Sequence, residues 1–138
     1  MFAWDDSYSV GDTDLDAQHL KIVGILNELY ALLQKTTLAP RGEPVQRLFQ
    51  NLTQHIVSHF AFEEEMLVRV GYPDVLIAQH RKEHDSFIDH IRRFHQALES
   101  GDRRALEEML PYLYGPWLIN HICGTDHQYI PYLKAAEH

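Results

Sequence analysis

The sequence has little that would suit a membrane or an oxidising compartment. Cys123 is its only cysteine, so no internal disulfide can form, which is typical of a protein of the reducing cytosol. No apolar run approaches the roughly 20 residues that a membrane-spanning helix needs. The N-terminal stretch carries Trp4, Asp5 and Asp6 instead of a basic start and an apolar core, so it does not resemble a secretory signal. We therefore expect a cytoplasmic protein without membrane insertion.

Basic residues are also scarce. Lys and Arg number 12 against 20 Asp and Glu, for a formal net charge of −8, and a nucleic-acid binder would need a basic stripe. Hydrophobic residues make up 45% of the 138 residues, which suits one domain with a sizeable core. What the sequence has in excess is histidine, with 10 residues. We expect no nucleic-acid partner, and the positions of the histidines become the main question.

Apolar residues recur with helical spacing in four segments, and no strand-like alternation competes with them. The segments cover about 16–35, 45–70, 73–100 and 102 onward. Thr36–Pro44 is predicted to be a connection, Gly101 a helix stop and Asp102 a helix N-cap. The pattern predicts an all-α fold, an antiparallel up-down-up-down four-helix bundle with an extended N-terminal arm, as a single domain over residues 1–138.

The fourth helix is the least regular of the four. Pro111 and Pro116 each remove a backbone donor and crowd the carbonyl four residues back, and Gly115 adds flexibility. We expect a kink or a late start in this helix.

Potential metal donors lie at helical spacing in the second and third segments. His59 precedes Glu63 by four residues, and His80 precedes His84 by four. Each pair therefore lies on one helix face, about 6 Å apart along the axis. His19 adds a donor one turn before the apolar Ile22 of the first segment.

The fourth segment has a different spacing. His121 and Asp126 are five residues apart, a step that does not stay on one face of an ideal α-helix. Gly124 lies between them, so we expect the helix to end or distort there and to turn Asp126 inward.

Seven such donors in a bundle core exceed what one ion can bind, so two ions are implied. If Glu63 and Asp126 both bridge, they fill four positions, the five histidines fill five, and a bridging oxide or hydroxide fills two. One position of two octahedra then stays open on the ion with fewer histidines. A small diatomic ligand needs such an open position.

Taken in order, His19, His59-xxx-Glu63, His80-xxx-His84 and His121-xxxx-Asp126 resemble the pattern of the hemerythrin family over essentially the whole chain. Trp4 and Asp16-Ala17-Gln18-His19 resemble its bacterial branch, the bacteriohemerythrins. The resemblance implies two iron ions with a bridging oxide or hydroxide. The first would be held by three histidines, the second by two, and both by the two carboxylates: His80, His84 and His121; His19 and His59; Glu63 and Asp126.

The same resemblance implies dioxygen binding at the second iron. Trp117 and Leu118 match the pair of residues that lines the dioxygen pocket in the family, three and four residues before His121. We therefore expect reversible dioxygen binding for storage, transport or delivery, without catalysis. An oxygen-consuming enzyme is the expected recipient, and we expect the chain to be a monomer.

Two other functions are left open, a di-iron enzyme (an oxidase, peroxidase or nitric oxide reductase) and an oxygen sensor. Ferritin-like di-iron enzymes use Glu-xx-His motifs, which this sequence lacks. A sensor would need a signalling domain, for which 138 residues leave no room. Among the other histidines, His55 is the main competitor as a ligand, and we expect it to pack or position instead. Tyr129 is expected either to pack or to hydrogen-bond near the bridging carboxylates.

Overall fold

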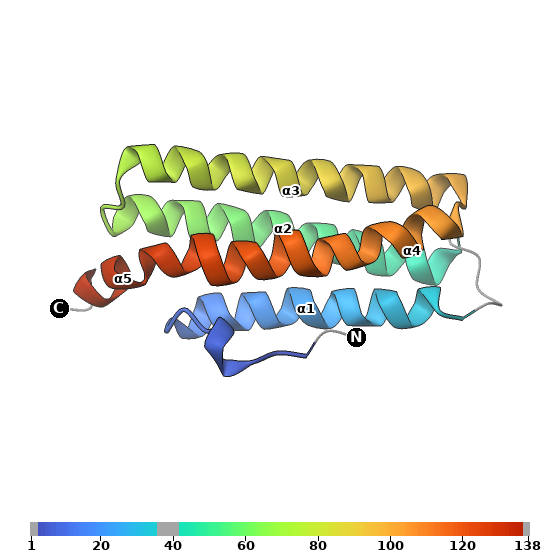
Figure 1. Ribbon diagram of the computed structural model, residues 1–138, viewed down its shortest axis with the longest axis horizontal. Helices are drawn as coiled ribbons and strands as arrows, with labels where there is room; N and C mark the ends of the chain where they lie inside the picture. The colour runs from blue at the N-terminus through green and yellow to red at the C-terminus, as the bar shows by residue number, and fades with distance from the viewer. Residues whose placement is uncertain (1–2, 36–41, 137–138) are drawn as a thin grey trace.

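The computed structural model describes residues 3–35 and 42–136, apart from the side chains of residues 116–118. Three long helices are followed by a composite fourth: α1 (Thr13–Leu33), α2 (Glu43–Arg69), α3 (Asp74–Ser100), and then α4 (Arg103–Tyr112), η2 (Leu113–Ile119), η3 (His121–Thr125), η4 (Asp126–Tyr129) and α5 (Ile130–Ala136). Figure 1 shows the four rods side by side, with successive rods running in opposite directions. The predicted antiparallel four-helix bundle is confirmed, and the described residues contain no strand.

Capping residues set the helix boundaries, at Gly101 and Asp102 as the sequence predicted and at Asp12 slightly earlier than the predicted start near Asp16. Asp12 caps α1 by accepting a hydrogen bond from the Leu15 amide at 3.0 Å. Gly101 ends α3 with φ of 71°, a left-handed conformation that glycine adopts without strain. The side chain of Asp102 then accepts from the Ala105 amide and starts α4.

The N-terminal arm folds back along the bundle and contains the short helix η1 (Asp6–Tyr8). Figure 1 shows it beside the start of α1. Trp4 and Tyr8 pack against the main hydrophobic core, and Asp16 on α1 accepts a hydrogen bond from the Val10 amide at 2.9 Å. The predicted arm is thus held to the bundle by both apolar and polar contacts.

The fourth rod does not start late, which corrects one of the two alternatives that its prolines suggested. α4 begins at Arg103 directly after its cap and includes Pro111. The irregularity takes the form of two π-helical segments, η2 and η3. In η2, which contains Pro116, the missing N–H interrupts the ordinary i→i−4 bonding, and a wider turn replaces it. Figure 1 shows the rod continuing past this region to α5.

The predicted connection Thr36–Pro44 lies largely outside the described residues, and only Gly42 and the first residues of α2 can be placed. Within the described ranges, every helix is too short or too polar to cross a bilayer.

Candidate metal centre

The seven predicted donors meet inside the bundle. Six of them are the complete set of buried polar or charged residues in the described part of the chain: His19, His59, Glu63, His80, His84 and Asp126. The seventh, His121, has a side chain 11% exposed. Burying this many polar groups in one place is costly unless they have partners, so the cluster requires a specific explanation.

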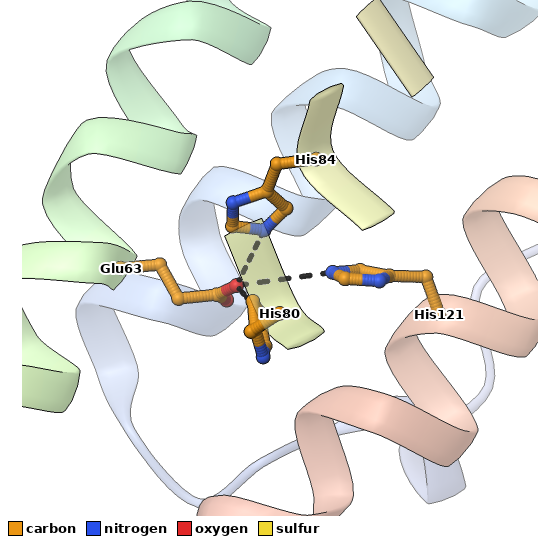
Figure 2. A group of neighbouring side chains, drawn as sticks. All are labelled: Glu63, His80, His84 and His121. Atoms are coloured by element: carbon orange, nitrogen blue, oxygen red, sulfur yellow. Dashed lines mark hydrogen bonds and ion pairs between the residues drawn. The ribbon is translucent and has the colours of Figure 1, made fainter. Parts of the chain in front are cut away.

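Three imidazoles surround one side of the two carboxylates. Figure 2 shows His80, His84 and His121 arranged around Glu63. Oε1 of Glu63 contacts Nε2 of His80 and lies 3.0 Å from Nε2 of His84. Oδ1 of Asp126 lies 3.0 Å from Nε2 of His121 and 3.2 Å from that of His80. The three histidines come from α3 and η3, so the site depends on the packing of separate rods.

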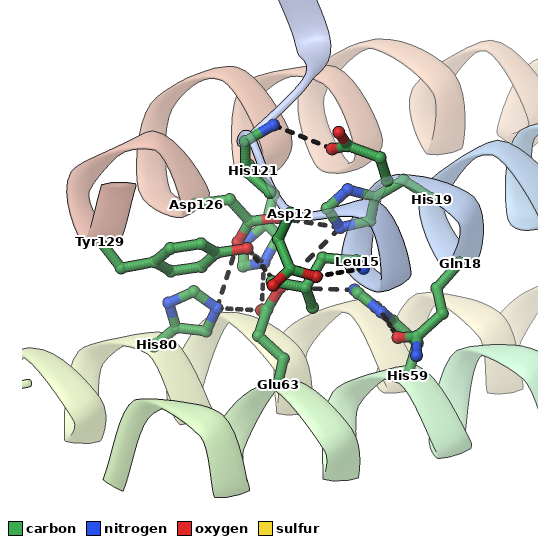
Figure 3. Close-up of polar contacts among 12 residues, drawn as sticks. Asp12, Leu15, Gln18, His19, His59, Glu63, His80, His121, Asp126 and Tyr129 are labelled. Carbon is green, nitrogen blue, oxygen red and sulfur yellow. Dashed lines mark hydrogen bonds and ion pairs between the residues drawn. The ribbon is translucent and has the colours of Figure 1, made fainter. Parts of the chain in front are cut away.

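The other two imidazoles face the opposite oxygens of the same carboxylates. Nε2 of His59 lies 3.4 Å from Oε2 of Glu63, and Nε2 of His19 lies 3.2 Å from Oδ2 of Asp126. Figure 3 shows both rings turned toward this shared centre. The donors therefore form two groups, each compact enough for one metal ion, and Glu63 belongs to both.

Asp126 reaches the centre because the backbone around it is π-helical. Its amide donates to the carbonyl of His121, an i→i+5 hydrogen bond. A π-helical turn contains more residues than an α-helical turn, so residues five apart come onto the same face. The sequence predicted that the helix would end or distort at Gly124 and turn Asp126 inward. The helix does not end there but is distorted, since Gly124 lies within the π-helical η3 and the rod continues.

Several unsatisfied atoms of the cluster are ones that a metal would contact. Nε2 of His19, Nε2 of His121 and both carboxylate oxygens of Asp126 are buried and have no hydrogen-bond partner among the described residues. Leaving a buried polar group unpaired costs about 1–3 kcal/mol. Imidazole nitrogen suits iron and similar transition metals, and carboxylate oxygen suits hard ions. The residues present therefore fit a pair of metal ions.

The electrostatics of the cluster agree with this fit. Burial alone would raise the pKa of Glu63, but the surrounding imidazoles of His121, His59, His80 and His84 outweigh it and hold that pKa well below its usual range. Burial and the charge of Glu63 would likewise raise the pKa of Asp126, yet the histidines lower it.

The pKa values of the histidines shift in different directions. Burial lowers the pKa of His84, and this outweighs its contact with Glu63. Burial also opposes protonation of His80, but Asp126 and Glu63 raise the pKa of His80 to about 9. The pKa of His121 is raised well above its usual value, because Asp126, Glu63 and Glu83 outweigh burial. The two carboxylates thus favour positive charge at His80 and His121, as they would favour bound metal ions.

Two aromatic residues support the cluster directly. The Tyr129 hydroxyl is fully buried and donates to Oε2 of Glu63 at 3.0 Å. Of the two alternatives predicted for Tyr129, the hydrogen bond near the two carboxylates is therefore the one observed. Figure 3 shows its ring beside His80. The ring of Phe60 stacks on His84, with centroids 3.7 Å apart and planes 8° apart. These contacts fix the orientation of donors on α2 and α3.

A small cavity of about 20 Å³ adjoins the cluster. It borders His19 and His59 from one group of donors, and His84 and His121 from the other. Its remaining lining is almost entirely apolar: Ile22, Ile56, Phe60, Phe87, Ile122 and the partly exposed Glu83. A volume of this size holds about one water-sized molecule.

By their spacing, these apolar residues are ordinary members of the apolar helix faces. A usable signal was present, because Ile22, Ile56 and Phe87 each lie three residues from a donor histidine and so one helical turn away. The predicted pocket residues Trp117 and Leu118 have side chains outside the described part of the structure. Their role in lining a pocket stays a prediction.

His55 is partly buried and belongs to neither group of metal donors. Three polar side chains with no predicted role lie on the outer side of the donors. Gln18 contacts His59, Glu64 lies near His84, and Glu83 lies near His121. Each is next to a candidate donor in the sequence, but the histidine that it approaches belongs to another helix, so only the folded structure shows these contacts.

A helical bundle with a buried centre of five imidazoles and two carboxylates defines a class, the non-haem metal-binding bundle proteins. Residues 10–133 match the family described as Hemerythrin HHE cation binding domain. The chain belongs to the hemerythrin family, which together with the donor cluster makes it a non-haem iron-binding protein.

Individual relatives agree with this assignment. The chain is 30% identical to a bacteriohemerythrin of Stenotrophomonas maltophilia over 98% of this chain and 83% of that protein. It is 29% identical to a bacteriohemerythrin of Clostridium acetobutylicum over 94% and 99% of the two chains. A hemerythrin-like protein of Naegleria gruberi is 28% identical over 93% and 90%. The predicted resemblance to the bacterial branch is confirmed.

Proposed function

We propose that the chain binds dioxygen reversibly at two iron ions, for oxygen storage, transport or delivery. The observation that carries this proposal is the unequal division of the donors. Three histidines face one pair of oxygens of Glu63 and Asp126, and two histidines face the other pair. With both carboxylates bridging, the ion next to His19 and His59 has fewer protein ligands and retains a position for a small ligand.

The iron pair, when bound, would supply the electrons and the open position that dioxygen needs. The protein residues supply the surroundings. His80, His84 and His121 would hold one ion, His19 and His59 the other, and Glu63 and Asp126 would bridge. The isoleucines that line the cavity make the region beside His19 and His59 apolar, and the small volume admits only a ligand of a few atoms.

A binding role fits this ligand set better than oxygen activation. The cluster offers two carboxylates and five imidazoles, so few anionic ligands are available to stabilise highly oxidised iron. We extend the proposal to a monomeric carrier in the cytoplasm that releases its oxygen to an oxygen-consuming enzyme.

An absorption spectrum of the reduced, iron-loaded protein tests the proposal. Exposure to air should produce a visible charge-transfer band, and removal of oxygen should abolish it over repeated cycles. His59→Ala, which removes one of the two histidines on the open side, should abolish the band, whereas His55→Ala should retain it. If the wild-type protein instead consumes oxygen continuously with a reductant and an organic substrate, the enzyme alternative is correct.

A further inference from the structure

The five imidazoles of the cluster all turn the same nitrogen inward. Each presents Nε2 to Glu63 or Asp126, so each Nδ1 points away from the centre. An imidazole can give Nε2 to a metal only if the proton of the neutral ring is on Nδ1. The group that accepts a hydrogen bond from Nδ1–H therefore controls both the tautomer of the ring and how strongly Nε2 binds the metal.

The outward nitrogens have unequal surroundings. Oε1 of Gln18 lies 2.7 Å from Nδ1 of His59, at hydrogen-bond distance, and an amide oxygen can only accept. Oε2 of Glu64 lies 3.5 Å from Nδ1 of His84, and Oε2 of Glu83 lies 3.8 Å from Nδ1 of His121. These two are electrostatic contacts rather than close hydrogen bonds. Nδ1 of His19 and Nδ1 of His80 have no hydrogen-bond partner among the described residues.

The charges of the side chains next to the outward nitrogens differ between the two groups of donors. Both carboxylates lie behind histidines of the three-histidine group, whereas the neutral amide lies behind the two-histidine group. A carboxylate near the outer N–H of a ligating histidine polarises that bond and makes the inner nitrogen a stronger donor, and a neutral amide does this less. We propose that Gln18, Glu64 and Glu83 are positioning residues that make the two metal positions unequal in affinity.

Glu83 should have the larger effect of the two carboxylates. Glu64 also pairs with Arg81, whose Nε lies 3.0 Å from Oε1, so its charge is largely balanced. The partner of Glu83 is the Thr125 hydroxyl, a neutral donor at 2.8 Å, which orients the carboxylate without cancelling its charge. The Glu83 side chain is 41% exposed, so solvent weakens its field, and we expect an effect at the low end of the range for such residues.

This inference rests on the proposed function, because it requires two metal positions. The test is an anaerobic calorimetric titration of the metal-free full-length chain with Fe²⁺ alone. Four variants are compared with wild type: Glu83→Gln, Glu64→Gln, Gln18→Glu and, as a matched control, Glu65→Gln. Glu65 is an exposed neighbour of Glu64 on α2, and its substitution removes the same charge without touching a donor histidine.

Wild type should bind two Fe²⁺ in two resolved steps. Glu83→Gln should weaken the tighter step by about tenfold and leave the weaker step unchanged. Glu64→Gln should weaken the tighter step less. Gln18→Glu should strengthen the weaker step, a gain that misfolding cannot produce. Glu65→Gln should change neither step.

Two results would overturn the inference in distinguishable ways. If wild type binds two Fe²⁺ but Glu83→Gln behaves like Glu65→Gln, or Gln18→Glu weakens binding, the positioning role is wrong and the proposed function stands. If wild type binds fewer than two Fe²⁺, both proposals fail.

Discussion

Removing a single hydroxyl from the centre, by Tyr129→Phe, should destabilise the metal-free protein measurably. The hydroxyl is fully buried and donates to Oε2 of Glu63 at 3.0 Å, while the pKa of Glu63 is held low enough to keep the carboxylate charged. A hydrogen bond to a charged group contributes about 1.5–3 kcal/mol. Because Oε2 keeps a contact with His59 at 3.4 Å, the loss should not exceed that range.

Urea unfolding of the metal-free variant and wild type measures this loss. With a typical denaturant slope of about 2 kcal/mol/M, the midpoint should fall by about 1 M at constant pH. Tyr132→Phe is the matched control, because Tyr132 belongs to the same apolar cluster as Tyr129 but is only partly buried. Its effect on the free energy of unfolding should stay within about 0.5 kcal/mol. A change for Tyr129→Phe as small as that of the control would refute the assigned hydrogen bond.

Three further perturbations probe the ligand register, the metal and the π-helical turn. His55→Ala should leave two irons per chain by metal analysis, whereas His59→Ala should leave at most one, because of the two only His59 belongs to a donor group. The reverse result would mean that the ligand on α2 has been assigned one helical turn away from its true position. Removing iron with a chelator should lower the melting temperature, because buried donors lose their partners, and equal melting temperatures would contradict this. Gly124→Ala should raise the free energy of unfolding by about 0.5–1 kcal/mol, because alanine favours a helix more than glycine does. The iron content should not change, because an added Cβ meets no neighbouring atom within 4 Å. Loss of iron would show that η3 requires glycine.

Local periodicity determined which residues could meet. The spacings of His59 with Glu63 and His80 with His84 are those of neighbours on one helix face, so the pairs were predictable without any tertiary information. The apolar stripes around them predicted the bundle, and the caps at Gly101 and Asp102 were predictable because they depend on short-range hydrogen bonds.

The five-residue step from His121 to Asp126 marks the limit of such reasoning. The sequence predicted that Asp126 turns inward because the helix ends or distorts, and only the structure shows that the distortion is a π-helical turn. Local propensity does not favour a π-helical turn, which is rare and found mostly at functional sites. The structure retains it where Asp126 faces the histidines from other helices.

The sequence by itself determined the fold class and the donor pairs of the second and third helices, because both follow from contacts within a turn or two of the same helix. Only the tertiary structure decided how the donors divide between the oxygens of Glu63 and Asp126, which residues line the cavity, and that Gln18 and Glu83 lie behind His59 and His121. These contacts join residues about 40 positions apart, and they depend on the rotation and offset of one helix against another. No spacing within a single helix encodes that rotation, so the chemistry of the site is set by how the helices pack.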